Sequence, residues 1–220
     1  MESKRLILST RRHEDKDGDK LTPKGQLGSL YLGTNLIIPV GGISFYHSKA
    51  KRAKETAVYI AKGAKIKNPS TAYSKDLNSI AISKDYVNKA FMVDGKMDLG
   101  VGIDYMINNE IPEGEETLQN AGARIQTHNL KLIRTLPYQT SDEKRIESIS
   151  HAPVVDGGLI NILNLNGPKV ESVSQIGGGF GVGENFEIIA DYNSKSGTFR
   201  FDLQYRVGNE VQKLENIKLI

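Results

Sequence analysis

The chain has 220 residues, of which 38% are hydrophobic and 25% charged, so it can bury a substantial core and has an ordinary globular composition. No run approaches the roughly 18 consecutive apolar residues of a membrane-spanning helix, and the start lacks the apolar core of a secretory signal. We therefore expect a cytoplasmic protein with no membrane partner. The absence of cysteine excludes disulfides, thiolate metal sites and cysteine nucleophiles.

The net charge of +3 is mild. Lysines and arginines cluster at residues 49–54 and 62–67, which is typical of the solvated face of a helix and of the loop after it. Neither a recognition motif nor an aromatic platform accompanies this charge, so we expect no nucleic-acid partner. The positive field instead favours small anionic substrates.

The first part of the chain alternates strand and helix patterns. Residues 5–10 predict a buried strand, and residues 22–33 predict a helix that starts with a threonine cap and a proline. Residues 43–46 predict a second strand, and Ser48 is the expected cap of the next helix, whose apolar positions are Ala50, Ala53, Ala57, Ile60 and Ala61. This order predicts an α/β fold, a three-layer sandwich with a mostly parallel central sheet flanked by helices.

The middle of the chain is less regular. Residues 64–112 hold short apolar pieces among polar residues and are expected to form an excursion that covers the sheet edge. A helix is predicted from about Thr117, with an apolar stripe of Leu118, Ala121, Ile125, Leu132 and Leu136. His128 lies on the same stripe and is interpreted as a histidine at the edge of the core. Residues 145–150 then predict a strand, and residues 154–165 a buried helix.

The C-terminal part has a different pattern. Residues 199–207 alternate apolar and polar side chains, as in a half-buried antiparallel strand, and residues 187–192 and 211–219 flank them. We therefore expect residues 171–220 to form a β-meander that packs on or extends an α/β core of residues 1–170. Its exposed edge could pair with a second copy in a homodimer.

Two further patterns are weak as functional signals. The run Gly177–Gly183 is rich in glycine but fits neither the dinucleotide nor the Walker pattern. We interpret it as a flexible connection, with a loop that lines the substrate pocket as the alternative. The four histidines, His13, His47, His128 and His151, show no ligand spacing, so we expect no metal site.

Histidines follow two of the predicted strands. His13 comes after the first strand, next to Arg12, and His151 ends the strand at 145–150. Arg52 lies one turn into the helix after the second strand. Because the carboxyl ends of parallel strands lie at one edge of a sheet, these side chains can meet. Arginine binds phosphate oxygens in a two-pronged fork and a neutral imidazole can attack phosphorus, so the pattern predicts a phosphate site.

Four short motifs occur in order along residues 5–165. They are Arg-His-Glu at 12–14 with Leu-Thr-Pro-Lys-Gly at 21–25, Ser-Lys-Ala-Lys-Arg-Ala-Lys-Glu-Thr-Ala at 48–57, Pro-Glu-Gly-Glu at 112–115, and Ser-His-Ala-Pro at 150–153. Together they resemble the motifs of the histidine phosphatase superfamily, also called the phosphoglycerate mutase-like family. Each motif alone is weak, but their shared order and spacing make the resemblance strong.

The resemblance implies a role for each matching residue. His13 matches the nucleophile that takes the phosphoryl group, and His151 matches the second histidine, which balances charge on that group. The implied substrate-binding residues are Arg12, Arg52, Glu14 and Ala152. A phosphoryl transition state spreads negative charge over its oxygens, and fixed cationic donors stabilise it. We therefore predict a metal-independent phosphatase without a cofactor, which hydrolyses a small phosphomonoester through a phosphohistidine on His13.

Proton transfer sets two further requirements. Attack by His13 needs an unprotonated ring nitrogen, so its other nitrogen should donate to a backbone carbonyl. The leaving alcohol needs a proton, which many family members supply from a glutamate. An ungapped count from the threonine of the second motif gives this position to Asp76, for which an exposed loop charge is the other interpretation. Asp85 and Glu116 are the reserve candidates.

Departures from the family motifs leave alternatives open. Glu14 stands where the family usually has glycine, and its carboxylate could repel phosphate unless Arg11 pairs with it or it points away. The loop of residues 14–20 is short and lacks the threonine and asparagine that mutases and several phosphatases use at the phosphate. The alternatives are a phosphoglycerate-type mutase, a non-catalytic member that binds a phosphorylated ligand or a protein, and an unrelated α/β domain with coincident motifs. The substrate is not encoded in any of these patterns.

Overall fold

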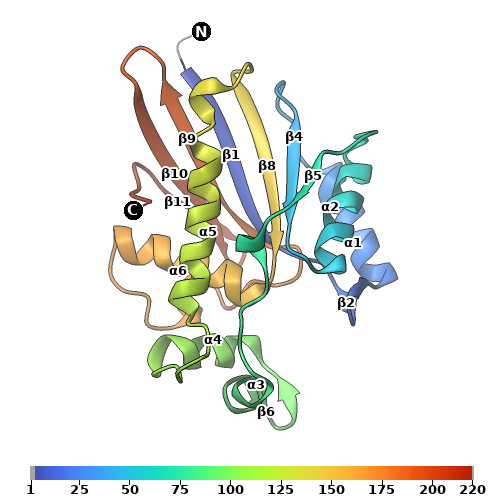
Figure 1. Cartoon of the computed structure of the whole chain (residues 1–220), viewed down its shortest axis with the longest axis vertical. Coiled ribbons are helices and arrows are strands. Elements are labelled where there is room, and N and C mark those ends of the chain that lie inside the picture. Colours follow the sequence, from blue (N-terminus) through green and yellow to red (C-terminus); the bar gives the residue numbers. More distant parts are fainter. Residues whose placement is uncertain (1–2, 220) are drawn as a thin grey trace.

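The computed structural model describes residues 3–219, which form one seven-stranded sheet with helices on both faces (Figure 1). Four strands run parallel in the order β1, β8, β4 and β5. Their bounds are Ser3–Arg12, Glu143–Ser150, Ile43–His47 and Thr71–Tyr73, respectively. On the other side of β1, three antiparallel strands extend the sheet: β9 (Asn185–Asn193), β10 (Thr198–Val207) and β11 (Glu210–Leu214). The predicted α/β sandwich with a C-terminal meander is confirmed.

One face of the sheet is covered by α1 (Pro23–Thr34) and α2 (Lys51–Gly63). The Thr22 hydroxyl accepts the backbone N–H of Gly25, as the predicted threonine cap requires. The two helices approach closely at Gly33, which has no side chain. A Cβ there would lie 2.0 Å from the Ile60 carbonyl oxygen, so any other residue would push α1 and α2 apart. The predicted cap of α2 is wrong: Ala50 occupies the cap position, and the Ser48 hydroxyl makes a different contact, described below.

The other face is covered by α5 (Leu118–Ile133) and α6 (Ala152–Asn166), which pack against the apolar side of β1 and β8. Thr117 caps α5, and the predicted stripe is buried. Leu136 is buried as well, but it lies beyond α5 in the short helix η2 (Leu136–Tyr138). Helix α6 begins two residues earlier than the predicted 154, because Pro153 is well suited to a first helical turn.

The segment 64–112 consists of a strand that joins the sheet and a helical part that lies outside it. Strand β5 joins the lateral edge of the sheet, followed by η1 (Lys75–Leu77). The rest contains α3 (Lys84–Phe91), a small hairpin of β6 (Met92–Val93) and β7 (Lys96–Met97), and α4 (Leu99–Asn108). Figure 1 shows α3 and α4 beyond the carboxyl ends of the parallel strands rather than along the edge. This part therefore lies at the end of the sheet where β1 and β8 deliver their histidines.

The meander is an extension of the central sheet, because β9 pairs with β1 from Ser3 to Arg11. The third predicted strand is shorter than expected. It ends at Leu214 rather than 219, since Asn216 has a positive φ of 55° and Ile217 N–H donates to the Phe201 carbonyl. None of the helices in residues 3–219 has the length and apolarity needed to cross a membrane.

Candidate active site

His13 and His151 lie side by side at the carboxyl ends of β1 and β8. The two strands are neighbours, and the backbone N–H of His13 donates to the Ser150 carbonyl at 3.0 Å. The ring centroids are 5.2 Å apart with the planes inclined by 70°. Both side chains are deeply buried, with 3% and 5% of their surface exposed. The structure thus brings together two residues that are distant in the sequence.

The His13 ring is held in one tautomer. Its Nδ1 lies 2.8 Å from the carbonyl oxygen of Glu14, which can only accept, so Nδ1 carries the hydrogen. The other nitrogen, Nε2, accepts a hydrogen bond from Arg52 Nε at 3.1 Å. Burial, with the nearby charges of Arg52, Arg12 and Lys16, lowers the pKa of His13 to about 4 despite the carbonyl bond. At neutral pH the ring is neutral, with a lone pair on Nε2.

Arg52 bridges the two histidines. Besides its bond to His13, its Nη2 lies 3.2 Å from Nδ1 of His151. Its Nη1 forms a 3.0 Å ion pair with Asp19, in the turn between β2 (Lys16–Asp17) and β3 (Lys20–Leu21). Asp19 also accepts the backbone N–H of Lys51 at the start of α2. The guanidinium therefore covers Nε2 of His13 and is anchored by the exposed carboxylate of Asp19.

His151 is fixed by Ser48, a contact that the sequence interpretation missed. Because Arg52 donates to Nδ1, the remaining ring nitrogen Nε2 donates to the Ser48 hydroxyl at 2.9 Å. Burial first, and then the neighbouring His13 and Arg52, lower the pKa of His151 to about 3. Helix α6 starts directly after it at Ala152, without a side-chain cap. A helix N-terminus favours an anion, so Ala152 lies at a suitable end for phosphate.

Arg12, the last residue of β1, is half-buried beside the glycine-rich run. Its Nη1 donates to the carbonyl of Phe180 at 2.6 Å, whereas its Nε has no partner among the residues that the structure describes. Its charge contributes to the lowered pKa values of His13 and His151. Two arginines and a helix N-terminus thus surround two neutral imidazoles.

Solved structures with the same arrangement of elements identify the fold. The chain matches a mycobacterial glucosyl-3-phosphoglycerate phosphatase with a TM-score of 0.60 and 14% identity, over 90% of this chain and 97% of that one. This chain shares the fold of that phosphatase, as the resemblance to the histidine phosphatase superfamily implies. A phosphoglycerate mutase from Bacillus anthracis matches with a TM-score of 0.58 and 16% identity, over 90% of this chain and 92% of that one. The resemblance seen in the motifs is confirmed for the fold.

A further match is a putative alpha-ribazole-5'-phosphate phosphatase from Escherichia coli, with a TM-score of 0.52 and 17% identity over 97% of both chains. No family model and no curated protein matches the sequence. The likeness to the histidine phosphatase superfamily is therefore limited to the backbone arrangement and the short motifs. Sequence identities of 14–17% establish a shared fold and not a shared activity.

Glu14 directly follows His13, and its side chain is buried. Its buried carboxylate packs between α1 and the glycine-rich run, where a Cβ at Gly28 would lie 2.9 Å from Oε2 and one at Gly183 would lie 2.2 Å from Oε1. Arg11 forms its ion pair with Glu147 at 3.1 Å; burial raises the pKa of Glu14, and the charge of Arg11 acts in the opposite direction. Within residues 3–219, the Glu14 carboxylate forms no hydrogen bond with the His13 ring. Its place among the substrate-binding residues stays a prediction.

The three candidate proton donors are not in contact with the histidines in the described part of the chain. Asp76 is buried and forms a 2.7 Å ion pair with Lys131 of α5. Glu116 forms two hydrogen bonds with Arg124, and Asp85 is exposed in the first turn of α3. Asp76 is nevertheless next to the site, because Leu77 accepts the hydroxyl of Ser150, the residue before His151. Its role as general acid stays a prediction.

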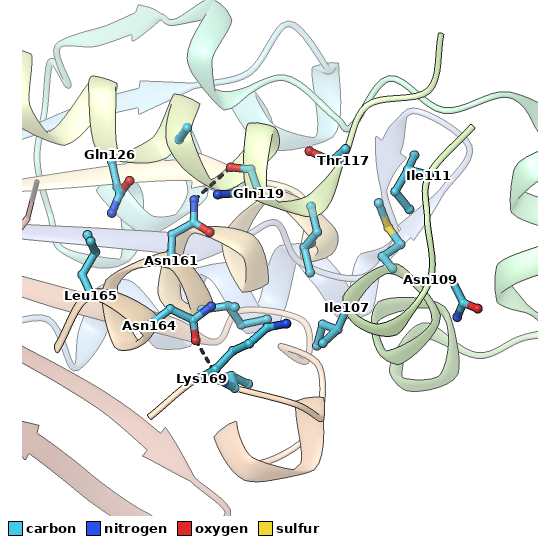
Figure 2. A pocket seen from close by; sticks show the side chains of 15 residues that line it. Ile107, Asn109, Ile111, Thr117, Gln119, Gln126, Asn161, Asn164, Leu165 and Lys169 are labelled. Atoms are coloured by element: carbon cyan, nitrogen blue, oxygen red, sulfur yellow. Dashed lines mark hydrogen bonds between the residues drawn. The ribbon is translucent and has the colours of Figure 1, made fainter. Parts of the chain in front are cut away.

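Neither His13 nor His151 lines the two cavities of about 650 and 630 Å³ in the described part of the chain. One of about 650 Å³ lies between α4, α5 and α6 (Figure 2). Two of its polar side chains have backbone partners, since Asn161 donates to the Gln119 carbonyl and Asn164 accepts the N–H of Val170, whereas Nε2 of Gln126 has none within residues 3–219. The guanidinium of Arg52 lies directly against the ring of His13. Within residues 3–219, no cluster of three or more His, Asp or Glu side chains is arranged to hold a metal ion.

Proposed function

We propose that this protein is a phosphatase that hydrolyses small phosphomonoesters through a phosphohistidine on His13, without a metal ion. The contact that carries the proposal is the bond between His13 Nδ1 and the Glu14 carbonyl. It leaves Nε2 unprotonated, and the pKa of about 4 keeps the ring neutral at physiological pH. A neutral imidazole with its lone pair directed into a cationic pocket is a competent nucleophile for phosphorus.

In the proposed reaction, Nε2 of His13 forms a bond to phosphorus while the bond from phosphorus to the ester oxygen breaks. The leaving oxygen takes a proton from a general acid, for which Asp76 is the candidate. Water then attacks phosphorus and gives a proton to the same carboxylate, while the phosphorus–nitrogen bond to His13 breaks and inorganic phosphate leaves. Arg12 and Arg52 neutralise charge on the phosphoryl oxygens. An arriving dianion raises the pKa of His151, which allows this second imidazole to take up a proton and balance the charge.

The similar solved structures support this chemistry by what their names state. Two of them are phosphatases, and one structure of the mycobacterial phosphatase contains inorganic phosphate. A third is a mutase, so isomerisation is the natural competing activity. A mutase has to retain and reorient its phosphorylated intermediate, and the short hairpin of β2 and β3 offers few groups for that task.

The test is release of phosphate from p-nitrophenyl phosphate in EDTA across pH 4–8. We expect turnover by the wild type, none by His13→Ala, and near-normal turnover by the matched variant His47→Gln, whose described ring contact is to the neighbouring Ser48 carbonyl. Acid-labile phosphate bound to the protein should appear during turnover. Activity that survives in His13→Ala contradicts the proposal. Isomerisation of monophosphoglycerate in the presence of bisphosphoglycerate would favour a mutase.

A further inference from the structure

The glycine-rich run Gly177–Gly183 is held at Phe180 rather than free. The backbone N–H of Phe180 donates to Oδ1 of Asp156 at 2.8 Å, and its carbonyl accepts Nη1 of Arg12 at 2.6 Å. The Phe180 side chain is buried, with its ring centroid 6.2 Å from that of Phe186. One residue of this run thus connects α6 with the end of β1. The interpretation as a flexible connection does not hold at Phe180.

Asp156 is an unusual residue for its place. It lies about one turn after His151 in α6, among apolar neighbours, and it is 0% exposed. Oδ1 holds the Phe180 amide, but Oδ2 has no partner within residues 3–219. Burial raises the pKa of this carboxyl to about 7. A buried carboxyl with one unsatisfied oxygen is costly to maintain, so its contact with Phe180 calls for an explanation.

Arg12 shows the complementary feature. Its guanidinium has one described hydrogen bond, to the Phe180 carbonyl, while its buried Nε lacks a partner. A guanidinium fixed at one nitrogen keeps a defined orientation and has other donors available for a ligand. The chain can present the Phe180 carbonyl here because Gly177 and Gly178 adopt left-handed φ values of 93° and 91°. The orientation of Arg12 therefore depends on where the run is anchored.

We propose that Asp156 is a positioning residue of the phosphate site: by holding the Phe180 amide it fixes the carbonyl that orients Arg12. The inference rests on the proposed function of the same site. It adds the C-terminal segment, which lies outside the four motifs, to the phosphate-binding machinery. Asp156 acts through the backbone of Phe180 and does not touch the substrate.

The acceptor and the charge of Asp156 can be separated by substitution. Asp156→Asn keeps an oxygen that accepts the Phe180 amide, whereas Asp156→Ala removes it. Loss of one buried hydrogen bond that orients a phosphate donor should weaken phosphate binding about tenfold. We expect this weakening in Asp156→Ala and a change of less than about twofold in Asp156→Asn. Because Arg12 contacts the phosphate group in the bound substrate as well, KM should rise more than kcat falls.

The experiment is calorimetric titration of the full chain with inorganic phosphate, which does not depend on turnover. Asp104→Ala is the matched control, since Asp104 holds the Val173 amide just upstream without contacting Arg12. It should bind phosphate as the wild type does. If Asp156→Ala does not fold, Asp156→Ser replaces it, because its hydroxyl is too short to reach the Phe180 amide.

Three results would overturn the inference. Unchanged phosphate binding in Asp156→Ala would show that Arg12 needs no such anchor. Equal weakening in Asp156→Asn and Asp156→Ala would mean that charge, and not the hydrogen bond to Phe180, matters. In both cases hydrolysis by the wild type would leave the proposed function intact. If the wild type neither binds phosphate nor hydrolyses the ester, both the inference about Asp156 and the proposed function are wrong.

Discussion

Under the proposed function, Arg52 has to give up a hydrogen bond before phosphate can reach Nε2 of His13. Its Nε donates to Nε2 of His13, the atom that would attack phosphorus, and its Nη1 is paired with Asp19 outside the pocket. A substrate therefore competes with Asp19 for the same guanidinium. We predict that Asp19→Asn makes substrate binding tighter. Asparagine can still accept from Arg52 and from the Lys51 amide, so the start of α2 is preserved.

The size of the effect follows from exposure. The Asp19 side chain is 60% exposed, and ion pairs in such positions contribute at most about 1 kcal/mol. That free energy corresponds to about a fivefold change in a binding constant. We expect KM for p-nitrophenyl phosphate to fall between about twofold and fivefold in Asp19→Asn, with kcat little changed, and the gain to shrink at high salt.

Initial rates over a range of substrate concentrations measure this effect. Asp17→Asn is the control, because it removes the same charge from an exposed position in the same hairpin. If KM is unchanged or higher in Asp19→Asn, then Asp19 does not restrain Arg52 but helps to place it for phosphate binding. A similar fall in KM for Asp17→Asn would assign the effect to net charge alone.

Two predictions concern stability. Burial lowers the pKa of His128 from 6.5 to about 4, so on acidification the imidazole is protonated in the unfolded chain before it is protonated in the folded one. The free energy that the neutral His128 contributes to folding is therefore fully present above pH 6.5 and is lost as the pH falls toward 4. His128→Asn should reduce that pH slope in urea unfolding by about 1.4 kcal/mol per pH unit, and an unchanged slope would contradict it. In Gly122→Ala, the new Cβ would lie 2.2 Å from the Gly157 carbonyl oxygen and force α5 from α6. Calorimetry should show a loss of about 1–3 kcal/mol, with Gly167→Ala, which has room, as the control that stays near wild type.

The sequence predicted elements whose signal is local and missed those that depend on packing. Strand β1 contains an apolar run, β4 is mostly apolar and β8 alternates weakly, while α1 and α5 start at threonine caps, so both kinds of element could be identified. Helices α3 and α4 are short and were not separated from the surrounding loops. Gly102 explains part of this: a Cβ there would lie 1.9 Å from the Phe91 ring. This glycine weakens the local helix signal but is required where α3 and α4 meet.

The candidate site divides in the same way. Sheet topology was sufficient to predict that His13, His151 and Arg52 converge, because the carboxyl ends of parallel strands share an edge. The contacts that tune these residues come from elsewhere. Ser48 was interpreted as a helix cap, although its place in the second motif was a signal of its own. Asp156 also carried a signal, since it is a lone charge inside an apolar helix, and such residues are seldom fully buried without a reason.

Glu14 shows why the departure from the family motif could not be judged from the motif itself. The tautomer of His13 requires only the backbone carbonyl of residue 14, which any residue supplies. The side chain needs space, and that space comes from Gly28 in α1 and Gly183 in the C-terminal run. A bulkier residue at either position would collide with the carboxylate. Glu14 is thus matched to distant glycines, and its presence constrains the packing of these two segments more than the phosphate chemistry.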